Sequence, residues 1–428
     1  SHSWTKFFGD AKLKKLILTG LKNNQDLKIV NQEIHISNNE ILSRRGEFLP
    51  KFMIGSQYEI EKVGRFTSQG ANDETAEYEP GKFVPAVLHT HQAGVFMSWE
   101  IDIWSKLRNA TRSAYWKYLA SQEVKKLVST QLVAEIANNY YELIALDQQL
   151  AIVRNFIGTL KQAQSMVEAQ KNAGRSTSLA VKRFQAEVLK NQSRVFKIKQ
   201  DIIIHENNLN QLLGRFPQPI NRSHRGLTAY IPKNFNTNIP AKLLDNRPDI
   251  KQASLELIAS RIDVKVAKAR FFPSLSIDAG VGYEAFDAKH FLKSPDSIFY
   301  NIAGNLAAPI INRNAIKADY FSANNKQIQA IYNYELQILK AYKEVSNQLT
   351  TLSNIKKIYQ LRRRQVSALY ESVDISNMLF KAARVDYIEA VMTRRDLLEA
   401  EIELVEIKKK QLTTYVNLYK SLGGGWHK

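Results

Sequence analysis

Long stretches of the chain carry apolar residues at helical spacing. Between about residues 104 and 173 there is no Pro, and from Leu143 to Leu160 the apolar positions are separated alternately by three and four residues. This heptad pattern is typical of a coiled-coil seam, and a similar seam covers about residues 342–373. A continuous helix of about 70 residues would be roughly 100 Å long, so the pattern predicts a long rod or tube. Shorter helical patterns cover about residues 10–46, 178–213, 240–270 and 386–422.

Between the helical stretches the apolar period changes to two, as in a strand with one apolar and one polar face. We predict four strands of about ten residues, two in each half of the chain, a length that crosses a bilayer at a tilt. Polar or Gly-containing loops join the strands of each pair, at about residues 63–91 and 286–296. Four strands cannot close a barrel, and lipid tolerates no open sheet edge, so a membrane location requires self-association. The alternative is a soluble sandwich whose apolar strand faces pack on one another.

The two halves of the chain repeat each other. The segments that begin at Asp26 and Phe48 recur at Asp249 and Phe271, each 223 positions later, and further landmarks recur 209 positions later, such as Arg175 as Arg384 and Leu213-Gly214 as Leu422-Gly423. Constant offsets predict a tandem pair of structural repeats. We expect a first repeat at 1–214, with a strand pair at about 48–104, a long helix at 104–173 and a helix at 178–213. A connector would follow at 215–240, and a second repeat at 241–422, with a strand pair at about 272–311, a long helix at 313–382 and a helix at 386–422. Residues 423–428 would form a tail.

The composition narrows the class of protein. No run of 18 apolar residues exists, which excludes a transmembrane helix but not a barrel of short strands. The chain has no Cys and a formal charge of +19. We interpret the charge as solvated helix faces rather than a nucleic-acid site, because the basic runs lie inside helical patterns. The sequence begins without an export signal, so we expect that any such signal was removed or not included.

Catalytic motifs are missing from the sequence. It has no H-E-x-x-H, no G-x-S-x-G and no phosphate-binding Gly loop, so we expect neither an enzyme nor a cofactor. His89-Thr90-His91 is the only close His pair, and it lacks nearby carboxylate or thiol support. We therefore interpret these residues as ordinary loop histidines, with a metal site as the alternative.

Four segments carry a resemblance to a known family: Trp99-Glu100-Ile101-Asp102-Ile103-Trp104-Ser105-Lys106, Leu243-Leu244-Asp245-Asn246-Arg247-Pro248-Asp249-Ile250, Ala267-Lys268-Ala269-Arg270-Phe271-Phe272-Pro273-Ser274-Leu275-Ser276 and Leu422-Gly423-Gly424-Gly425-Trp426. In order and spacing they resemble the TolC-like outer-membrane efflux channels, in the branch that serves resistance-nodulation-division (RND) pumps. The resemblance covers almost the whole chain.

The resemblance implies a mixed α and β membrane protein. Three identical chains would each give four strands to one twelve-stranded outer-membrane β-barrel, continuous with a long periplasmic α-helical barrel. The homotrimer would lie in outer-membrane lipid of a Gram-negative bacterium and dock on a periplasmic adaptor (membrane fusion) protein, and through it on an inner-membrane RND transporter. Many members of this branch are lipoproteins with an acylated N-terminal Cys, so a lipid anchor is an expectation that the resemblance alone implies.

The function that the resemblance implies is a passive exit duct for drugs or other small toxic compounds. One alternative keeps the fold and changes the client, as the outer-membrane channel of a type I protein secretion system. Another alternative is a soluble coiled-coil scaffold. The motif Arg247-Pro248-Asp249 and the C-terminal Gly run favour efflux.

In this architecture the narrowest part of the bore would lie at two helix-to-helix turns at the periplasmic tip. We hypothesise that Arg175 and Arg384 face Asp386 and Glu389 of neighbouring subunits and hold the tip shut, with Tyr387 filling the bore. The alternative is that these charges are solvated and that helix packing alone closes the tip. The same turns are the expected docking surface for the adaptor, through Gly174, Arg175, Ser176, Thr177, Ala383, Arg384 and Val385. The family usually has Gly near position 383, so the second turn departs from its pattern.

The polar strand faces would line the water-filled lumen of the barrel. We expect that their carboxylates make the upper channel acidic, so that cations and zwitterions pass more easily than anions. The residues concerned are Glu59, Glu61, Glu100, Asp102, Asp278 and Glu284.

Overall fold

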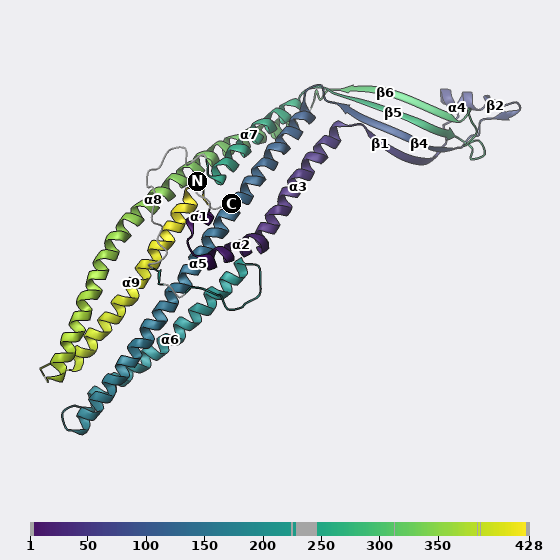
Figure 1. Cartoon of the computed structure of the whole chain (residues 1–428). Helices are drawn as coiled ribbons and strands as arrows, with labels where there is room; N and C mark the ends of the chain where they lie inside the picture. Colours follow the sequence, from purple (N-terminus) through teal and green to yellow (C-terminus); the bar gives the residue numbers. More distant parts are fainter. Residues whose placement is uncertain are drawn as a thin grey trace. The chain divides into compact units, whose positions relative to one another are not determined.

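The computed structural model describes residues 4–223, 226–227, 246–311, 313–382, 384–385 and 387–424. It is mostly helical, with one larger and one smaller sheet (Figure 1). Two compact units can be distinguished: Ser1–Ile34, Ala120–Ser254 and Asn333–Lys428 form one, and His35–Leu119 and Leu255–Tyr332 form the other. Each unit therefore takes segments from both halves of the sequence, as expected of an interleaved repeat.

Two pairs of helices dominate the chain. Helix α5 (Lys106–Asn172) has 67 residues and α8 (Asn314–Lys381) has 68, and each is followed by a helix of 35 residues, α6 (Ser178–Leu212) and α9 (Tyr387–Ser421). Each long helix and its successor form an antiparallel hairpin (Figure 1). Helices α5 and α8 end 209 positions apart, and α6 and α9 begin and end 209 positions apart, which is the offset read from the sequence.

The stretch predicted as one helix at about residues 10–46 is divided into two, α2 (Ala11–Asn23) and α3 (Gln25–Phe48), and a short helix α1 (Trp4–Phe7) precedes it. The break lies at Asn24, which has an extended backbone, with φ −56° and ψ 134°. Its side chain accepts a hydrogen bond from Leu27 N (3.0 Å) and donates one to Leu212 O (3.0 Å). Asn is a preferred residue at such helix starts because its side chain replaces missing backbone partners. Apolar periodicity continues across this break and therefore did not reveal it.

Arg247 occupies the position of Asn24 in the second repeat, 223 residues later, directly before α7 (Pro248–Ala269). Its Nη1 donates to Ser421 O (2.9 Å), while Nε and Nη2 donate to the two oxygens of Asp249 (3.0 and 2.6 Å). Nη2 also donates to Glu344 (2.9 Å). Burial alone would lower the pKa of Arg247, but Asp249 and Glu344 outweigh burial and hold this pKa above its ordinary value. The Arg-Pro-Asp motif therefore joins three helices of one unit.

Both repeats end their last helix with the same glycine turn. Gly214 and Gly423 have φ of 65° and 75°, a backbone conformation in which other residues are strained. A Cβ at Gly214 would overlap the carbonyl oxygen of Asn23, and one at Gly423 would lie 2.9 Å from the carbonyl oxygen of Asn246. Asn23 and Asn246 are 223 positions apart, whereas Gly214 and Gly423 are 209 apart. The same glycine contact therefore occurs in both repeats, between residues that follow the two different offsets.

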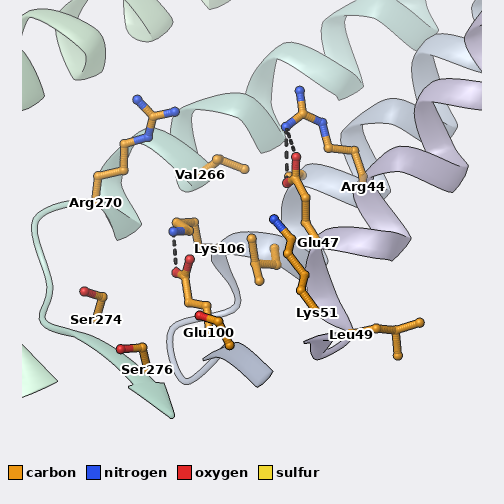
Figure 2. A pocket seen from close by; sticks show the side chains of 13 residues that line it. Arg44, Glu47, Leu49, Lys51, Glu100, Lys106, Val266, Arg270, Ser274 and Ser276 are labelled. Atoms are coloured by element: carbon orange, nitrogen blue, oxygen red, sulfur yellow. Dashed lines mark hydrogen bonds and ion pairs between the residues drawn. The ribbon is translucent and has the colours of Figure 1, made fainter. Parts of the chain in front are cut away.

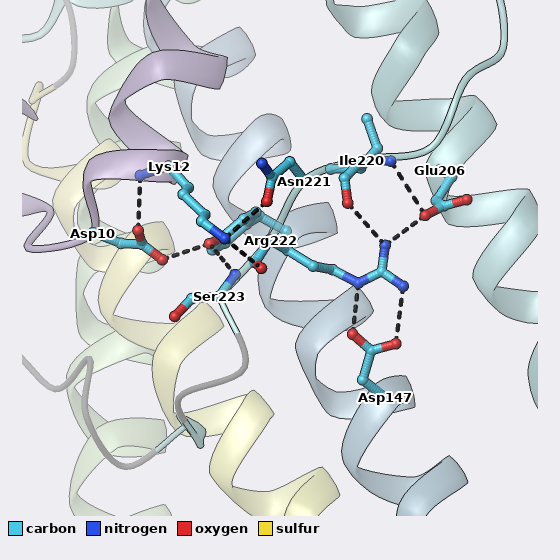
Figure 3. A network of polar contacts seen from close by, with 9 residues as sticks. Asp10, Lys12, Asp147, Glu206, Ile220, Asn221, Arg222 and Ser223 are labelled. Carbon is cyan, nitrogen blue, oxygen red and sulfur yellow. Dashed lines mark hydrogen bonds and ion pairs between the residues drawn. The ribbon is translucent and has the colours of Figure 1, made fainter.

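A polar network holds residues 220–223 against the helices of the same unit (Figure 3). Arg222 donates through Nε and Nη2 to the carboxylate of Asp147 (2.6 and 2.9 Å), and through Nη1 to Glu206. The hydrogen bond to Asp147, together with Glu206, raises the pKa of Arg222 above its ordinary value despite burial. Lys12 Nζ donates to Asn221 Oδ1 (2.8 Å). Most of the connector predicted at 215–240 lies outside the described residues, so its extent stays a prediction.

The larger sheet contains four strands, β1 (Lys51–Glu61), β4 (Leu88–Ile101), β5 (Ser274–Ala285) and β6 (Ile298–Ala307). All neighbours are antiparallel in the order β1-β4-β5-β6, so β1 and β6 are edge strands. The segment between β1 and β4 was predicted as a loop, but it contains α4 (Ser68–Asp73) and a small hairpin of β2 (Glu77–Glu79) and β3 (Lys82–Phe83). Tyr78 and Glu79 of this hairpin contact the loop of the second repeat, at Phe286 (5.2 Å between rings) and Lys293 (3.5 Å).

Candidate functional site

The register of the larger sheet assigns each of its side chains to one of two faces, because opposed residues of antiparallel strands point the same way. One face is apolar and largely exposed: Ile54 is 89% exposed and Tyr300 is 82% exposed. An apolar surface of this extent indicates a face that is covered by something outside the chain. It includes Phe52, Ile54, Ile60, Val95, Trp99, Ile277, Val281, Tyr300, Ile302 and Leu306.

No helix in the described part of the chain has both the length and the apolar content that a membrane span requires.

The opposite face of the sheet carries five of the six acidic residues that the sequence singled out. Opposed pairs place Glu59 beside Thr90, Glu284 beside Gln92, Asp278 beside Ser98, and Glu100 beside Ser276, and Glu61 follows Glu59 by one alternation. Glu284 accepts a hydrogen bond from Gln92 (3.1 Å), and Asp278 accepts one from Asn305 (3.0 Å). The sequence therefore grouped these side chains correctly on one face, and their position along a lumen stays a prediction.

The prediction for Asp102 is wrong. Strand β4 ends at Ile101, and the side chain of Asp102 is 1% exposed. Its carboxylate accepts hydrogen bonds from the backbone N–H groups of Leu107 (3.0 Å) and Arg108 (3.0 Å) and from Arg108 Nε (3.2 Å). Burial alone would raise the pKa of Asp102, but these donors outweigh it and hold the pKa below its ordinary value. Asp102 therefore stabilises the first turn of α5, because that turn has backbone donors without helical partners.

The polar face is basic at the end nearest the helices. Arg44, Lys51, Lys106 and Arg270 line an open pocket of about 540 Å³ there (Figure 2). Two carboxylates in this pocket are already paired, Glu47 with Arg44 and Glu100 with Lys106. Lys51 forms no ion pair with any residue that the structure describes. The expected acidic face is therefore mixed in charge at this end, where Glu100 and Asp278 lie among the basic groups, while Glu59, Glu61 and Glu284 lie at the far end of the strands.

The turn between α5 and α6 contains the first set of predicted tip residues. Gly174 has φ 72°, and the N–H of Arg175 donates to Gln170 O (2.8 Å). Thr177 begins α6 by accepting a hydrogen bond from Ala180 N (3.2 Å). Gly174, Arg175 and Thr177 are exposed and Ser176 is half-buried, so this turn is accessible to a partner.

The turn between α8 and α9 repeats one hydrogen bond of the first turn. The N–H of Arg384 donates to Leu379 O (2.9 Å), which repeats the bond of Arg175 at an offset of 209. Arg384 and Glu389 are exposed, and Val385 is half-buried. Ala383, Asp386 and the side chain of Tyr387 lie outside the described part of the structure. Within the described part, Arg175, Arg384 and Glu389 form no ion pair in the chain, so the hypothesis of pairs between subunits stays a prediction.

His89 and His91 were predicted in a loop, but they lie in strand β4, on the apolar face of the sheet. The hydroxyl of Tyr58 is 2.7 Å from His89 Nδ1, and the rings of Tyr58 and His91 are 4.9 Å apart. Within the described ranges, no group of three or more His, Cys, Asp or Glu side chains is arranged to hold a metal ion. The two histidines thus have aromatic neighbours, which agrees better with a packing role than with metal binding.

Comparison with known proteins identifies the family. The family model described as outer membrane efflux protein matches residues 16–215 and 239–424. The chain belongs to this family. It is a transport protein of the TolC-like outer membrane channels and not an enzyme.

Individual relatives and solved structures agree with this assignment. The efflux protein is 26% identical over 425 residues to the pyoverdine export outer membrane protein OpmQ of Pseudomonas aeruginosa, covering 99% of this chain and 88% of OpmQ. It is 24% identical over 424 residues to the probable outer membrane lipoprotein SilC of Salmonella typhimurium, with coverage of 99% and 88%. A crystal structure of CusC matches with a TM-score of 0.88 and 22% identity, over 99% of this chain and 95% of that one. This last likeness concerns the fold.

Proposed function

We propose that this chain is the passive outer-membrane exit duct of a tripartite RND-type efflux pump, exporting drugs or other small toxic compounds. Three copies form a homotrimer and close one twelve-stranded barrel, which continues into a periplasmic helical barrel. A periplasmic adaptor protein joins the duct to an inner-membrane RND transporter. The lipoprotein description of SilC supports a lipid anchor in this family.

The larger sheet carries this proposal. It has an exposed apolar face, a polar face and two unpaired edges, at β1 and β6. An open edge in lipid would leave unpaired backbone groups at a cost of several kcal/mol each, and four strands are too few to close on themselves. Pairing of β6 with β1 of the next copy removes every edge at once. The apolar face then contacts lipid and the polar face contacts water.

The nature of the cargo is supported by the relatives. OpmQ is named for pyoverdine export, and a second relative is named as a cation efflux system protein. Both names refer to cargo much smaller than a protein, which favours small-molecule efflux over type I protein secretion. The polar face should make the outer end of the bore acidic, through Glu59, Glu61 and Glu284. Its helical end should be mixed in charge, because basic groups lie there beside Glu100 and Asp278.

The native mass of the detergent-extracted protein, corrected for bound detergent, tests the assembly. We expect three times the chain mass of 48.9 kDa. A monomer that stays in solution without detergent would contradict the membrane assignment. Export is then tested by deleting the gene and measuring drug susceptibility, with and without a plasmid that carries the gene.

The two tip turns are proposed as the periplasmic gate and the adaptor-docking surface. Arg175, Arg384, Asp386 and Glu389 would pair between subunits, and Tyr387 would fill the bore. The absence of ion pairs for Arg175, Arg384 and Glu389 among the described residues of one chain leaves these charges available to a neighbour. Single-channel conductance of the Asp386→Ala, Glu389→Ala double variant should rise, and a conductance equal to wild type would contradict the gate. Gly174→Trp should prevent co-purification of the adaptor without changing the native mass.

A further inference from the structure

The two helical hairpins differ in their interiors near the tip. Between α5 and α6 an apolar core is fully closed: Val167 and Ala180 are 0% exposed and Phe184 is 1% exposed. Leu160, Ala163 and Val188 complete this cluster. The first hairpin is therefore held together by close apolar packing over its last turns.

Polar residues occupy the corresponding positions of the second hairpin. At the offset of 209, Val167 becomes Ser376, Ala180 becomes Glu389 and Phe184 becomes Thr393. These three residues line an open pocket of about 350 Å³ between α8 and α9. We call it the second-hairpin pocket; its other described lining residues are Leu369, Ser372, Ile375, Leu379, Val385 and Asp396. A core in one repeat is thus replaced by a pocket in the other.

The second-hairpin pocket has a buried polar group without a partner. Ser376 is 8% exposed, and its Oγ has no hydrogen-bond partner among the described residues. The two other hydroxyls are satisfied, Ser372 by Ala368 O (2.8 Å) and Thr393 by Glu389 O (2.7 Å). A buried hydroxyl without a partner costs free energy, so Ser376 indicates that the pocket receives a hydrogen-bonding occupant.

The charge and shape of the pocket define the chemistry of that occupant. Glu389 forms no ion pair with a described residue. Asp396 forms one ion pair with a described residue, a long one of 3.6 Å between its Oδ1 and Nη2 of the adjacent Arg395. The opposite wall is formed by Leu369, Ile375 and Leu379. Two carboxylates attract a cation, and the aliphatic wall favours a cation with an apolar body. A metal ion fits less well, because no described cluster supplies three or more His, Cys, Asp or Glu ligands.

We propose that the second-hairpin pocket binds a small organic amine, with its ammonium group at Glu389, Asp396 and the Ser376 hydroxyl and its apolar body against the aliphatic wall. Such a ligand fills the space that Val167 and Phe184 fill in the first hairpin. It therefore links α8 to α9 near the tip. The site stands on the pocket and the comparison of the hairpins. It uses the Glu389 carboxylate that the proposed gate would pair with a neighbouring subunit, so amine binding and gate pairing exclude each other at this residue.

Isothermal titration of the full-length protein in detergent with 2-phenylethylamine tests this site, and 2-phenylethanol serves as the uncharged probe. We expect saturable heat with the amine and none with the alcohol. In a Ser376→Val, Glu389→Ala, Thr393→Phe variant, which carries the first-hairpin residues, binding of the amine should be lost. Glu371→Ala removes an exposed carboxylate elsewhere on α8 and should bind the amine like wild type.

A second variant covers the case in which the triple variant does not fold. Glu389→Gln keeps the shape of the side chain and should weaken amine binding about tenfold, the loss that one charge-assisted hydrogen bond accounts for. Equal binding of amine and alcohol, or equal affinity of wild type and Glu389→Gln, would overturn the proposal. Absence of saturable heat with wild type would overturn it too and would mean that the pocket holds water or a neighbouring chain.

Discussion

Asn24 and Arg247 occupy the same position in the two repeats, and each donates a hydrogen bond to the carbonyl oxygen that ends the last helix of its own repeat. The acceptors are Leu212, at the end of α6, and Ser421, at the end of α9. The last carbonyls of a helix have no helical partner, so each repeat must supply a donor at this place. The backbone requirement is the same in both repeats, but an amide meets it in one and a guanidinium in the other.

The interiors of the two hairpins diverge because no backbone requirement restrains them. Val167 and Ser376 lie at matching positions of helices that end in register. One is packed in a closed core, and the other lines an open pocket. The comparison teaches that the repeat preserves the path of the chain more strictly than the chemistry of its side chains.

The largest effect should come from Arg247. In Arg247→Ala, Asp249 loses its ion-pair partner and Ser421 O loses its hydrogen-bond donor, at a cost of about 3–5 kcal/mol for a broken buried ion pair. Asn24→Ala should cost roughly 1–3 kcal/mol, because only neutral hydrogen bonds are lost. Apparent melting temperatures in detergent, followed by circular dichroism, check this order. Equal losses would show that the second repeat does not depend on the ion pairs, and Arg247→Lys separates charge from the two-pronged geometry.

Exchange of residues between the hairpins should have the next largest effect. Val167→Ser should cost roughly 2–4 kcal/mol, since it buries an unpaired hydroxyl and removes apolar contacts. Ser376→Val should raise the melting temperature, because it removes the hydroxyl that has no partner. The two single variants control each other at matched positions. A fall in stability for Ser376→Val would mean that the Ser376 hydroxyl has a partner, which would contradict its assignment as an unpaired group in the second-hairpin pocket.

Two glycine substitutions separate the cost of a close atomic contact from the cost of a left-handed backbone. Gly214→Ala should cost more than the roughly 1–2 kcal/mol of a left-handed backbone, because its Cβ would also overlap Asn23 O. Gly174→Ala has a similar φ, but no other group lies within 4 Å of its Cβ, so it should cost the backbone term alone. Thermal denaturation of both variants checks the difference. Equal losses would mean that Asn23 moves aside without cost.

Asp102 should give the smallest effect and a defined pH dependence. Its pKa is lower in the folded state than in the unfolded state, so its contribution is fully present above the ordinary Asp pKa of about 4 and is lost as the pH falls through the lowered value. Asp102→Asn should cost about 0.5–2 kcal/mol at neutral pH and should reduce the acid sensitivity of the melting temperature. Glu59→Gln, at the exposed far end of the sheet, is the control. Identical acid profiles for wild type and Asp102→Asn would contradict this assignment.

Much of the fold could be predicted from local patterns. The long helices were expected at 104–173 and 313–382, and the structure has them at Lys106–Asn172 and Asn314–Lys381. The period of two identified four strands and grouped Glu59, Glu61, Glu100, Asp278 and Glu284 on one face. Such patterns succeed because helix and strand periodicity report which side of an element is buried.

The misplaced residues have partners that are not visible in a local pattern. Asp102 continues the alternation of β4, but the backbone donors of α5 turn it inward. The small hairpin of β2 and β3 lies in a segment that is too short and polar to give a clear period. The tip residues were found from the turns that interrupt the helical pattern, and their pairing between subunits stays a prediction.

By itself the sequence determined the repeat, the lengths of the helices and the two faces of the sheet, because these depend on spacing along one segment. Only the tertiary structure decided which donor completes each helix end, since Asn24 and Leu212 are 188 residues apart and Arg247 and Ser421 are 174 apart. The same holds for the contrast between the hairpins. Whether a serine lies in a core or beside a pocket depends on the combined volume of the side chains on two helices. The sequence of one helix does not determine that combined volume.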